Sequence, residues 1–449
     1  MGKGSFIKIL ILILVLLSFF SDWGFFYSSV RPTISFPEIG AMIFIIFWLL
    51  GKFLRKGLKI SPKSLQIFFL IFSIFLVATI GAILHFDQIS LSEHLKSSVK
   101  LIFWAIFMFC WVNAVKSIFT DIKFSNRVWT CYLNCALVIS GITIFQYIFH
   151  QFTGQHLNLN PFLKQSWGVI GGYYRATGIY REPSWLGVVL IPPLIAQGKL
   201  FFTKNKVSYL WKFLFLVAGV LVSLSLANFI VLGIWGVFIF LKWIYQELSI
   251  FFKIKVKRNE FQTISAIFFL LIIVVFIIIQ WIFPLVLPRI QTEFNAFIYN
   301  FKYGAQILTS GAKRFASYEG FVAILKRSPL FGVGFDQRDY VSYLVGKYFE
   351  STTSGIFGFI GTSAGLIGII LFLYMLKFIW NGGEKKKIKI REKNQPDLLL
   401  IGRAIVVALL LEQIFLYAGI LNADFWIPLA FAYLFVKSGQ LEVKKENEK

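Results

Sequence analysis

The chain has 449 residues, of which 57% are hydrophobic and only 15% are charged, and its mean hydropathy is +0.74. Soluble domains carry about 25% charged residues, so this composition excludes a water-soluble globular fold and requires a bilayer to solvate part of the surface. In a soluble protein, the net charge of +24 would suggest nucleic acid as a partner. Here the basic residues lie in short loops between apolar runs, so no nucleic-acid partner is expected.

Twelve apolar runs follow one another along the chain, and several approach the ~20 residues that cross a bilayer. They predict an all-α membrane protein of about twelve transmembrane helices, forming a single transmembrane domain over residues 1–449. The first run follows Lys3 and Lys8 and lacks a small-x-small cleavage site, so it is interpreted as a span and not as a removed signal peptide. The runs are residues 6–26, 38–53, 65–84, 99–119, 128–149, 184–202, 209–225, 227–244, 261–283, 355–380, 398–417 and 422–436.

The charge of the connecting loops alternates along the chain. Basic residues crowd the loops after the second, fourth, sixth, eighth and tenth runs and the C-terminal tail, whereas the short loops between them are poor in Lys and Arg. Loops rich in Lys and Arg stay in the cytoplasm. The alternation therefore predicts that both termini and the Lys-rich loop at residues 381–397 are cytoplasmic. It also predicts two long external segments, residues 150–183 and the large, partly helical loop at residues 284–354, and such long segments usually carry function.

The first external segment ends in a cluster of charged and aromatic residues where the sixth span begins. Arg175, Arg181 and Glu182 precede Ser184, which follows Pro183 in a pattern typical of a helix start. The planar guanidinium fork suits phosphate or carboxylate. Charged groups at this depth are costly unless they are paired or face water. The residues are therefore either an anion site or an interfacial Arg181–Glu182 anchor.

A second cluster lies in the large external loop. Apolar residues recur at helical spacing from 315 to 325, which predicts a helix that Pro329 stops. Arg314 lies on or beside the apolar face of that helix, either directed inward or placed at the edge of the face and paired with a loop acid. Gly332 and Gly334 then form a flexible turn, and a Gly-rich turn beside Arg can receive an anion.

Few other side chains suggest chemistry. Glu412 and Gln413 lie in the outer half of the eleventh span, where a carboxylate is either functional or hydrogen-bonded to a neighbouring helix. The three cysteines lie within apolar runs, and the four histidines show no ligand spacing. No metal site and no cofactor are expected.

Three stretches resemble the O-antigen ligase and O-antigen polymerase family of membrane glycosyltransferases. They are Arg-Ala-Thr-Gly-Ile-Tyr-Arg-Glu-Pro-Ser at 175–184, Arg314 followed by Pro-Leu-Phe-Gly-Val-Gly at 329–334, and Thr-Ser-Gly at 353–355 leading to Gly-Leu-Ile-Gly at 365–368. The resemblance extends over roughly residues 175–370 and the hydropathy layout. Ser354 stands where ligases of that family carry a His, which favours a polymerase-type member.

The resemblance implies joining of oligosaccharide repeat units carried on an undecaprenyl-type pyrophosphate lipid, outside a bacterial cytoplasmic membrane. The product would be a surface polysaccharide such as O-antigen, capsule or exopolysaccharide, with a flippase and a chain-length regulator as possible partners. External Arg residues would hold the pyrophosphate as it departs, and an acid would deprotonate the attacking sugar hydroxyl. The candidate catalytic residues are Glu182, Arg314 and Glu319, and the candidate substrate-binding residues are Arg175, Arg181, Tyr318, Arg327, Arg338 and Asp336.

Two other functions compete with polymerisation. A ligase of the same family would transfer finished polymer to an acceptor. A flippase for lipid-linked oligosaccharides would place charged residues along a path through many spans. The predicted mid-membrane region of this chain is nearly free of charge, and the polar residues gather at the external face, which favours the enzyme.

Overall fold

The computed structural model describes residues 3–28, 31–53, 60–116, 120–160, 169–170, 173–251, 310–346, 355–384, 397–415 and 419–447, and residues 118, 291 and 295 singly. It divides into two compact units, residues 1–225 with 316–449 and residues 226–315. The second unit contributes α8 (Leu226–Phe251). All other elements described below belong to the first unit, except the first turns of α11, which begins at Ser310.

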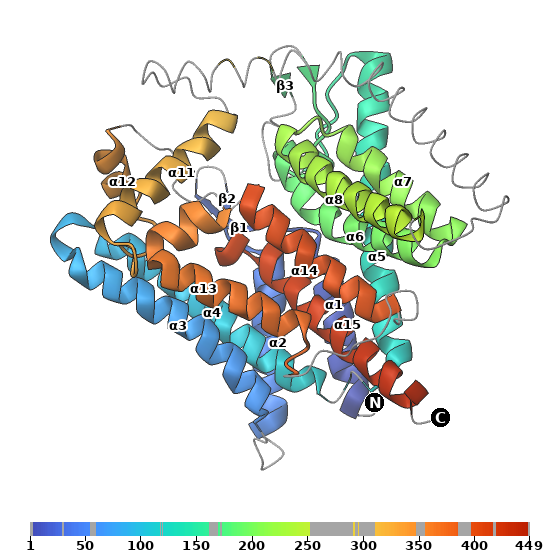
Figure 1. Ribbon diagram of the computed structural model, residues 1–449, viewed down its shortest axis with the longest axis horizontal. Coiled ribbons are helices and arrows are strands. Elements are labelled where there is room, and N and C mark those ends of the chain that lie inside the picture. The colour runs from blue at the N-terminus through green and yellow to red at the C-terminus, as the bar shows by residue number, and fades with distance from the viewer. Residues whose placement is uncertain are drawn as a thin grey trace. The chain divides into compact units, whose positions relative to one another are not determined.

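The described chain is helical apart from two short antiparallel hairpins (Figure 1). The hairpins are β1 (Gly24–Ser28) with β2 (Arg31–Ser35), and β3 (Val169–Ile170) with β4 (Tyr173–Tyr174). A π-helical turn at Ile356–Gly361 precedes α13. The first-unit helices are α1 (Lys3–Ser18), α2 (Phe36–Phe53), α3 (Pro62–Leu84), α4 (Leu91–Val115), α5 (Ile122–Thr153), α6 (Pro183–Lys204), α7 (Val207–Leu221), α11 (Ser310–Arg327), α12 (Arg338–Val345), α13 (Thr362–Trp380), α14 (Asp397–Phe415) and α15 (Ala423–Asn447).

Six described helices are long and apolar enough to cross a bilayer, namely α2 to α6 and the segment that ends in α13. Shorter apolar helices are found in α1, α7 and α8. Long apolar helices whose backbone groups are satisfied internally are the structures that span membranes. The chain is therefore a multi-pass helical membrane protein. The total of twelve spans stays a prediction, because the ninth, residues 261–283, lies outside the described residues.

Each of the other eleven predicted spans coincides with a helix. The first span is shorter in the structure than the sequence predicts. The first was expected to continue to residue 26, but α1 ends at Ser18 and β1 begins at Gly24. The carbonyl of Phe19 accepts the hydroxyl of Tyr180, and the carbonyl of Trp23 accepts the amide of Phe36. Long-range partners thus replace the helical ones, which apolar patterning alone does not predict.

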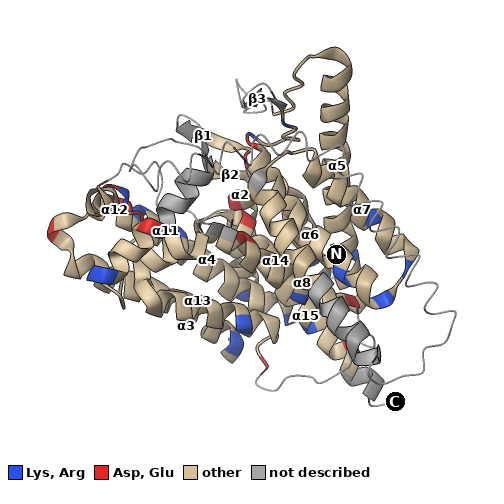
Figure 2. Ribbon diagram, turned by 45° about the horizontal axis from the view of Figure 1, so that its top comes forward, with Lys and Arg blue, Asp and Glu red and all other residues tan. Residues whose placement is uncertain are grey.

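Loops that were predicted to lie on one side of the membrane meet at one end of the first unit, here called the basic end. Lys8 binds Asp121 at 2.6 Å, and Lys63 and Lys437 both bind Glu384 at 2.7 Å. A hydrogen bond of 2.7 Å between the hydroxyls of Ser125 and Ser438 joins the start of α5 to α15. Figure 2 shows that most charged residues of the described chain lie near the helix ends.

Helix α15 forms the centre of the first unit (Figure 1). Every residue from 423 to 440 is buried, and α15 packs against α1, α2, α4, α5, α6, α13 and α14. Trp111 donates its indole N–H to the carbonyl of Ala430 at 2.7 Å, and Trp426 stacks on Trp104. A helix surrounded by protein need not be apolar on every face, which explains why its apolar run in the sequence is short.

Helix α13 is broken where the loop at residues 329–334 touches it. Gly365 has non-helical angles, φ 62° and ψ −158°. The carbonyls of Pro329 and Leu330 accept the amides of Leu366 and Ile367 at 2.9 and 3.3 Å. Non-helical backbone within a membrane protein must find such partners, so residues 329–334 complete the hydrogen bonding of α13.

Candidate functional site

Residues 175–184, here called the arginine segment, join β4 to α6 and are held by α5 and by the end of α7. The amide of Ala176 donates to the carbonyl of Val222 at the end of α7, 3.2 Å away. Gln146 of α5 accepts the amide of Gly178 at 2.7 Å and donates to the carbonyl of the same residue at 2.8 Å. Gly178 has φ +64°, and a Cβ there would lie 2.9 Å from the hydroxyl of Thr143. Glycine is therefore needed at this turn.

The loop after α1 holds the second half of the arginine segment. Tyr180 is fully buried and donates its hydroxyl to Phe19. Trp23 donates its indole N–H to the carbonyl of Ile179 at 3.1 Å, and the amide of Arg181 donates to Oδ2 of Asp22 at 2.9 Å. Burial raises the pKa of Tyr180, and the nearby carboxylates of Asp424 and Asp22 raise it further. The segment is thus positioned by residues that are distant from it in the sequence.

Two guanidinium groups are carried on this rigid segment. The side chain of Arg175 is only 6% exposed. Arg181 is partly buried, and its Nη2 lies 4.0 Å from Oε1 of Glu182. Glu182 immediately precedes α6 and accepts a hydrogen bond of 3.3 Å from the hydroxyl of Ser184. The predicted helix start is confirmed, with Pro183 as its first residue. The arrangement combines two permanent positive charges with the positive end of a helix dipole, which suits a phosphate-like anion.

A small cavity lined by acids lies beside the first turn of α6. Its lining includes Trp185, Glu412, Gln413, Asn422 and Asp424. Its volume of about 10 Å³ is enough for the centre of one water molecule. Glu412 and Gln413 are 2% and 3% exposed, and Oε1 of each has no hydrogen-bond partner among the described residues. Buried polar atoms normally have a partner, so this cavity is a functional candidate.

Three aromatic rings cluster where the arginine segment begins. The ring centroids of Tyr174, His150 and His156 lie 4.1 to 5.2 Å from one another, and the closest pair is Tyr174 with His150. Tyr174 is buried, His150 is partly buried and His156 is exposed. Flat aromatic faces next to an anion site suit the apolar faces of sugar rings.

The Pro-Leu-Phe-Gly-Val-Gly loop has a structural role. The amides of Val333 and Gly334 donate to the carbonyls of Thr362 and Ser363, at 2.9 and 3.0 Å, and the amide of Gly332 donates to Ser328. The expectation that this turn could receive an anion is therefore wrong, because its amides are already bonded to backbone carbonyls. The close approach of the loop to α13 explains the glycines, since a Cβ on Gly332 would collide with the carbonyl oxygen of Thr362.

Asp336, directly after this loop, is the most unusual acid of the second cluster. It has φ +54°, a strained conformation for a residue other than glycine. Burial raises its pKa; the positive charges of Arg338 and Lys96 oppose this shift, and the carboxylates of Glu93 and Asp339 add to it. Its neighbour Gln337 bonds both the amide and the carbonyl of Ser90, at 2.7 and 2.9 Å. Strain and a raised pKa together mark Asp336 as a candidate for proton transfer.

The remaining candidates between residues 284 and 354 are spread along α11 and α12. The predicted helix is confirmed as α11, which ends at Arg327 before Pro329. Glu319 and Arg338 are partly buried, and Arg327 is exposed. The side chains of Arg314 and Tyr318 lie outside the described residues. The predicted meeting of Arg314 with Arg175 and Arg181 therefore stays a prediction.

Several residues that hold the site were not singled out from the sequence. Asp22, Gln146 and Asp424 are polar residues within or next to apolar runs, and that position was the signal that could have found them. His94 is one of the four histidines that show no ligand spacing, and its structural role was not predicted. It accepts the amide of Phe335 at 3.0 Å and stacks on its ring. Its partner is 241 residues away, a separation that local patterning does not bridge.

The fold and the site define a multi-pass helical membrane protein. Ion-paired lysines lie at one end of its first unit, and the buried Arg175, the partly buried Arg181 and buried acids lie away from that end. Comparisons of the chain with protein-family models, with curated proteins and with solved structures find no match.

Proposed function

We propose that this chain is a polysaccharide polymerase that joins oligosaccharide repeat units carried on a lipid pyrophosphate. The reaction takes place at the external face of a bacterial cytoplasmic membrane. The basic end and both termini face the cytoplasm, and the arginine segment faces outward. The growing chain on one lipid is transferred to a sugar hydroxyl of the next unit, and the lipid pyrophosphate departs. A flippase that delivers the units and a chain-length regulator are the expected partners.

The observation that carries this proposal is the arginine segment itself. Arg175 is buried, and Arg181, two residues before the start of α6, is partly buried. The planar fork of a guanidinium suits the oxygens of a phosphate. Two such groups held in place could bind a departing diphosphate, and fixed donors aimed at it lower the barrier.

The acids beside the segment supply the second requirement, a proton acceptor. Glu182 is the first candidate, because it precedes α6 and is already oriented by Ser184 and Arg181. Glu412 is added by the structure, since it lies with Trp185 around the acidic cavity, beside the first turn of α6. Glu319 and Asp336 remain candidates in the second cluster. A group within reach of the attacking hydroxyl would act as general base.

A transporter for the same lipid-linked units is the second candidate, because Glu412 and Asp424 are buried acids inside the helical unit. A proton- or cation-coupled path would use such acids. Their cavity is also lined by Trp185, the third residue of α6, so they lie next to the arginine segment. That position favours a role in the same reaction.

The test is polymer formation by purified full-length protein in liposomes with a lipid-pyrophosphate-linked repeat unit, read as a ladder on a gel. Lys keeps the charge of Arg but loses its planar fork. We expect Arg175→Lys, Arg181→Lys and Arg314→Lys each to lower the rate by about 10²–10³, the usual loss for one aimed donor. Arg391→Lys, in the loop at residues 381–397, is the matched control and should be unaffected. Movement of the lipid-linked unit across the bilayer without any ladder would establish the transporter instead.

A further inference from the structure

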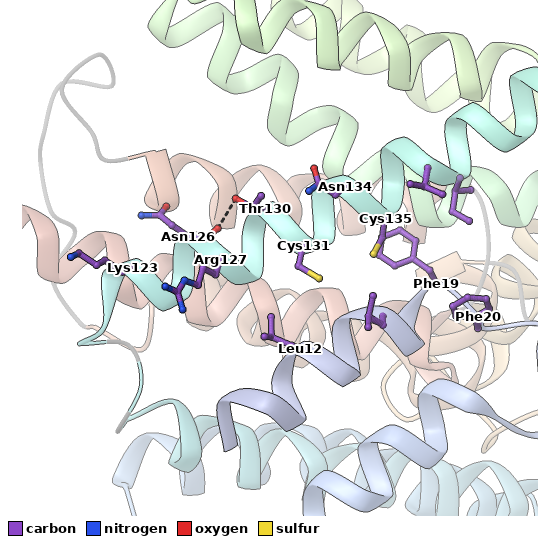
Figure 3. A pocket seen from close by; sticks show the side chains of 13 residues that line it. Leu12, Phe19, Phe20, Lys123, Asn126, Arg127, Thr130, Cys131, Asn134 and Cys135 are labelled. Atoms are coloured by element: carbon purple, nitrogen blue, oxygen red, sulfur yellow. Dashed lines mark hydrogen bonds between the residues drawn. The ribbon is translucent and has the colours of Figure 1, made fainter. Parts of the chain in front are cut away.

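A groove of about 840 Å³ runs between α1 and α5 (Figure 3). Its lining is mostly apolar and includes Leu12, Leu16 and Phe19 of α1 and Val138 and Ile139 of α5. Leu16 and Val138 are exposed. An open apolar groove of this size on a membrane protein faces lipid or another protein, and the volume lies in the range of ordinary ligand sites.

One end of the groove is basic. Lys123 and Arg127, on the first turns of α5, line it together with Asn126 and Thr130 (Figure 3). Both basic side chains are exposed, and neither forms an ion pair or hydrogen bond with a described side chain. The nearby carboxylate of Asp121 is already bound to Lys8 at 2.6 Å. Two positive charges are thus left at the mouth of an apolar groove, at the basic end.

The length of the groove matches one leaflet of a bilayer. From Lys123 to Ile139 the α5 axis advances by about 24 Å, at ~1.5 Å per residue. Half of the hydrocarbon core is about 15 Å, and one headgroup layer adds about 5–8 Å. A lipid with its phosphate at Lys123 and Arg127 would therefore place its acyl chain beside Leu12, Leu16 and Val138.

We propose that this groove binds an anionic phospholipid of the leaflet at the basic end, with its phosphate between Lys123 and Arg127 and its acyl chain between α1 and α5. Basic pockets between helices on this side of a membrane commonly hold anionic headgroups. A second copy of the chain fits less well, because parallel copies that met at this groove would bring their Lys123 and Arg127 side chains together. The site is separate from the proposed reaction.

In the test, a photoreactive p-benzoylphenylalanine is placed at position 138 of the full-length chain. Native membranes are irradiated, and the intact mass of the purified protein is measured by mass spectrometry. We expect adducts of diacyl phospholipid mass that are enriched in anionic lipids. The same probe at Ile148 is the matched control, because Ile148 is exposed on α5 but does not line the groove, and it should report the bulk lipid composition.

The headgroup contact is tested with Lys123→Gln and Arg127→Gln together. Each basic residue near an anionic lipid contributes about fivefold in binding, so the anionic adduct should fall by about 30-fold. Lys116→Gln with Lys212→Gln removes the same charge from exposed lysines outside the groove and should leave the adduct unchanged. An adduct of protein mass would show that a partner helix occupies the groove. Adducts that match those of the Ile148 probe, or that survive the double substitution, would also overturn the proposal.

Discussion

At the scale of single residues, Gln146 connects two separate segments of backbone through one side chain. Its amide makes hydrogen bonds of 2.7, 2.8 and 2.9 Å with the backbone of Gly178 and Leu157. It is completely buried, so no water can replace these contacts if the side chain is lost. One side chain therefore fixes both the turn of the arginine segment and the loop that follows α5.

We predict that Gln146→Leu destabilises the protein by about 3 kcal/mol, because it leaves buried backbone groups without partners. Thermal unfolding in detergent measures this loss. The control is Gln151→Leu on the same helix, where Gln151 is exposed and the effect should stay within about 0.5 kcal/mol. Equal unfolding temperatures for the two variants would contradict the assigned role.

At the scale of elements, the broken helix α13 and the loop at residues 329–334 depend on each other. Gly365 has φ +62°, and a Cβ there would lie 2.5 Å from the carbonyl carbon of Leu330. We predict that Gly365→Ala costs at least about 2 kcal/mol, since both backbone strain and a clash oppose it.

The matched control for that substitution is Gly51→Ala in α2, where a Cβ would meet no atom within 4 Å. Alanine there should be neutral or stabilising by up to about 1 kcal/mol. The unfolding temperatures of both variants in detergent provide the comparison. If Gly365→Ala were as stable as Gly51→Ala, the loop would not be held against α13 as described.

A second element-scale prediction concerns Glu384, which joins α3 and α15 through Lys63 and Lys437. Hydrogen bonds from these lysines lower the pKa of Glu384 to about 2, against about 4.3 in an unfolded chain. The ionised carboxylate therefore favours the folded state above pH ~4.3, and this contribution is lost as the pH falls toward 2.

Glu384→Gln should lower stability at pH 7 by no more than about 1 kcal/mol, because the carboxylate is partly exposed to solvent. The gap between the two proteins should close between pH 4 and pH 2. Thermal unfolding at pH 7, 4 and 3 measures it. Glu93→Gln, which breaks an exposed pair with Lys96, serves as the control. A gap that is the same at pH 7 and pH 3 would refute the ion-pair explanation.

Much of the element layout could be predicted from the sequence, and its limits have physical causes. Runs of apolar residues indicated α2 to α6, because a span must be apolar wherever it faces lipid. The early end of α1 and the break in α13 could not be predicted, since both depend on partners distant in sequence. In the site, Arg175, Arg181 and Glu182 stood out by charge, but Asp22 and Gln146 act through contacts that only the fold creates.

At the scale of the whole molecule, the arrangement of loops predicts a sidedness that can be measured. The basic end carries the Lys-rich contacts, and positive loops remain in the cytoplasm. A cysteine introduced at Asn381, beside Glu384, should react with an impermeant thiol reagent only after the cells are permeabilised. A cysteine at Ser310, in the predicted external loop, should react in intact cells. The reverse pattern would invert the proposed topology and place the arginine segment on the wrong side for polymer synthesis.

The central position of α15 has a consequence for biogenesis. This helix is synthesised after every helix that it touches, and residues 423–440 are buried among seven of them. Until α15 has been synthesised, lipid or a chaperone must cover the surfaces of the earlier helices that α15 contacts in the complete fold. A chain that stops before α15 would leave the helix surfaces that normally contact α15 exposed to lipid. We therefore expect such truncated chains to be degraded by membrane proteases.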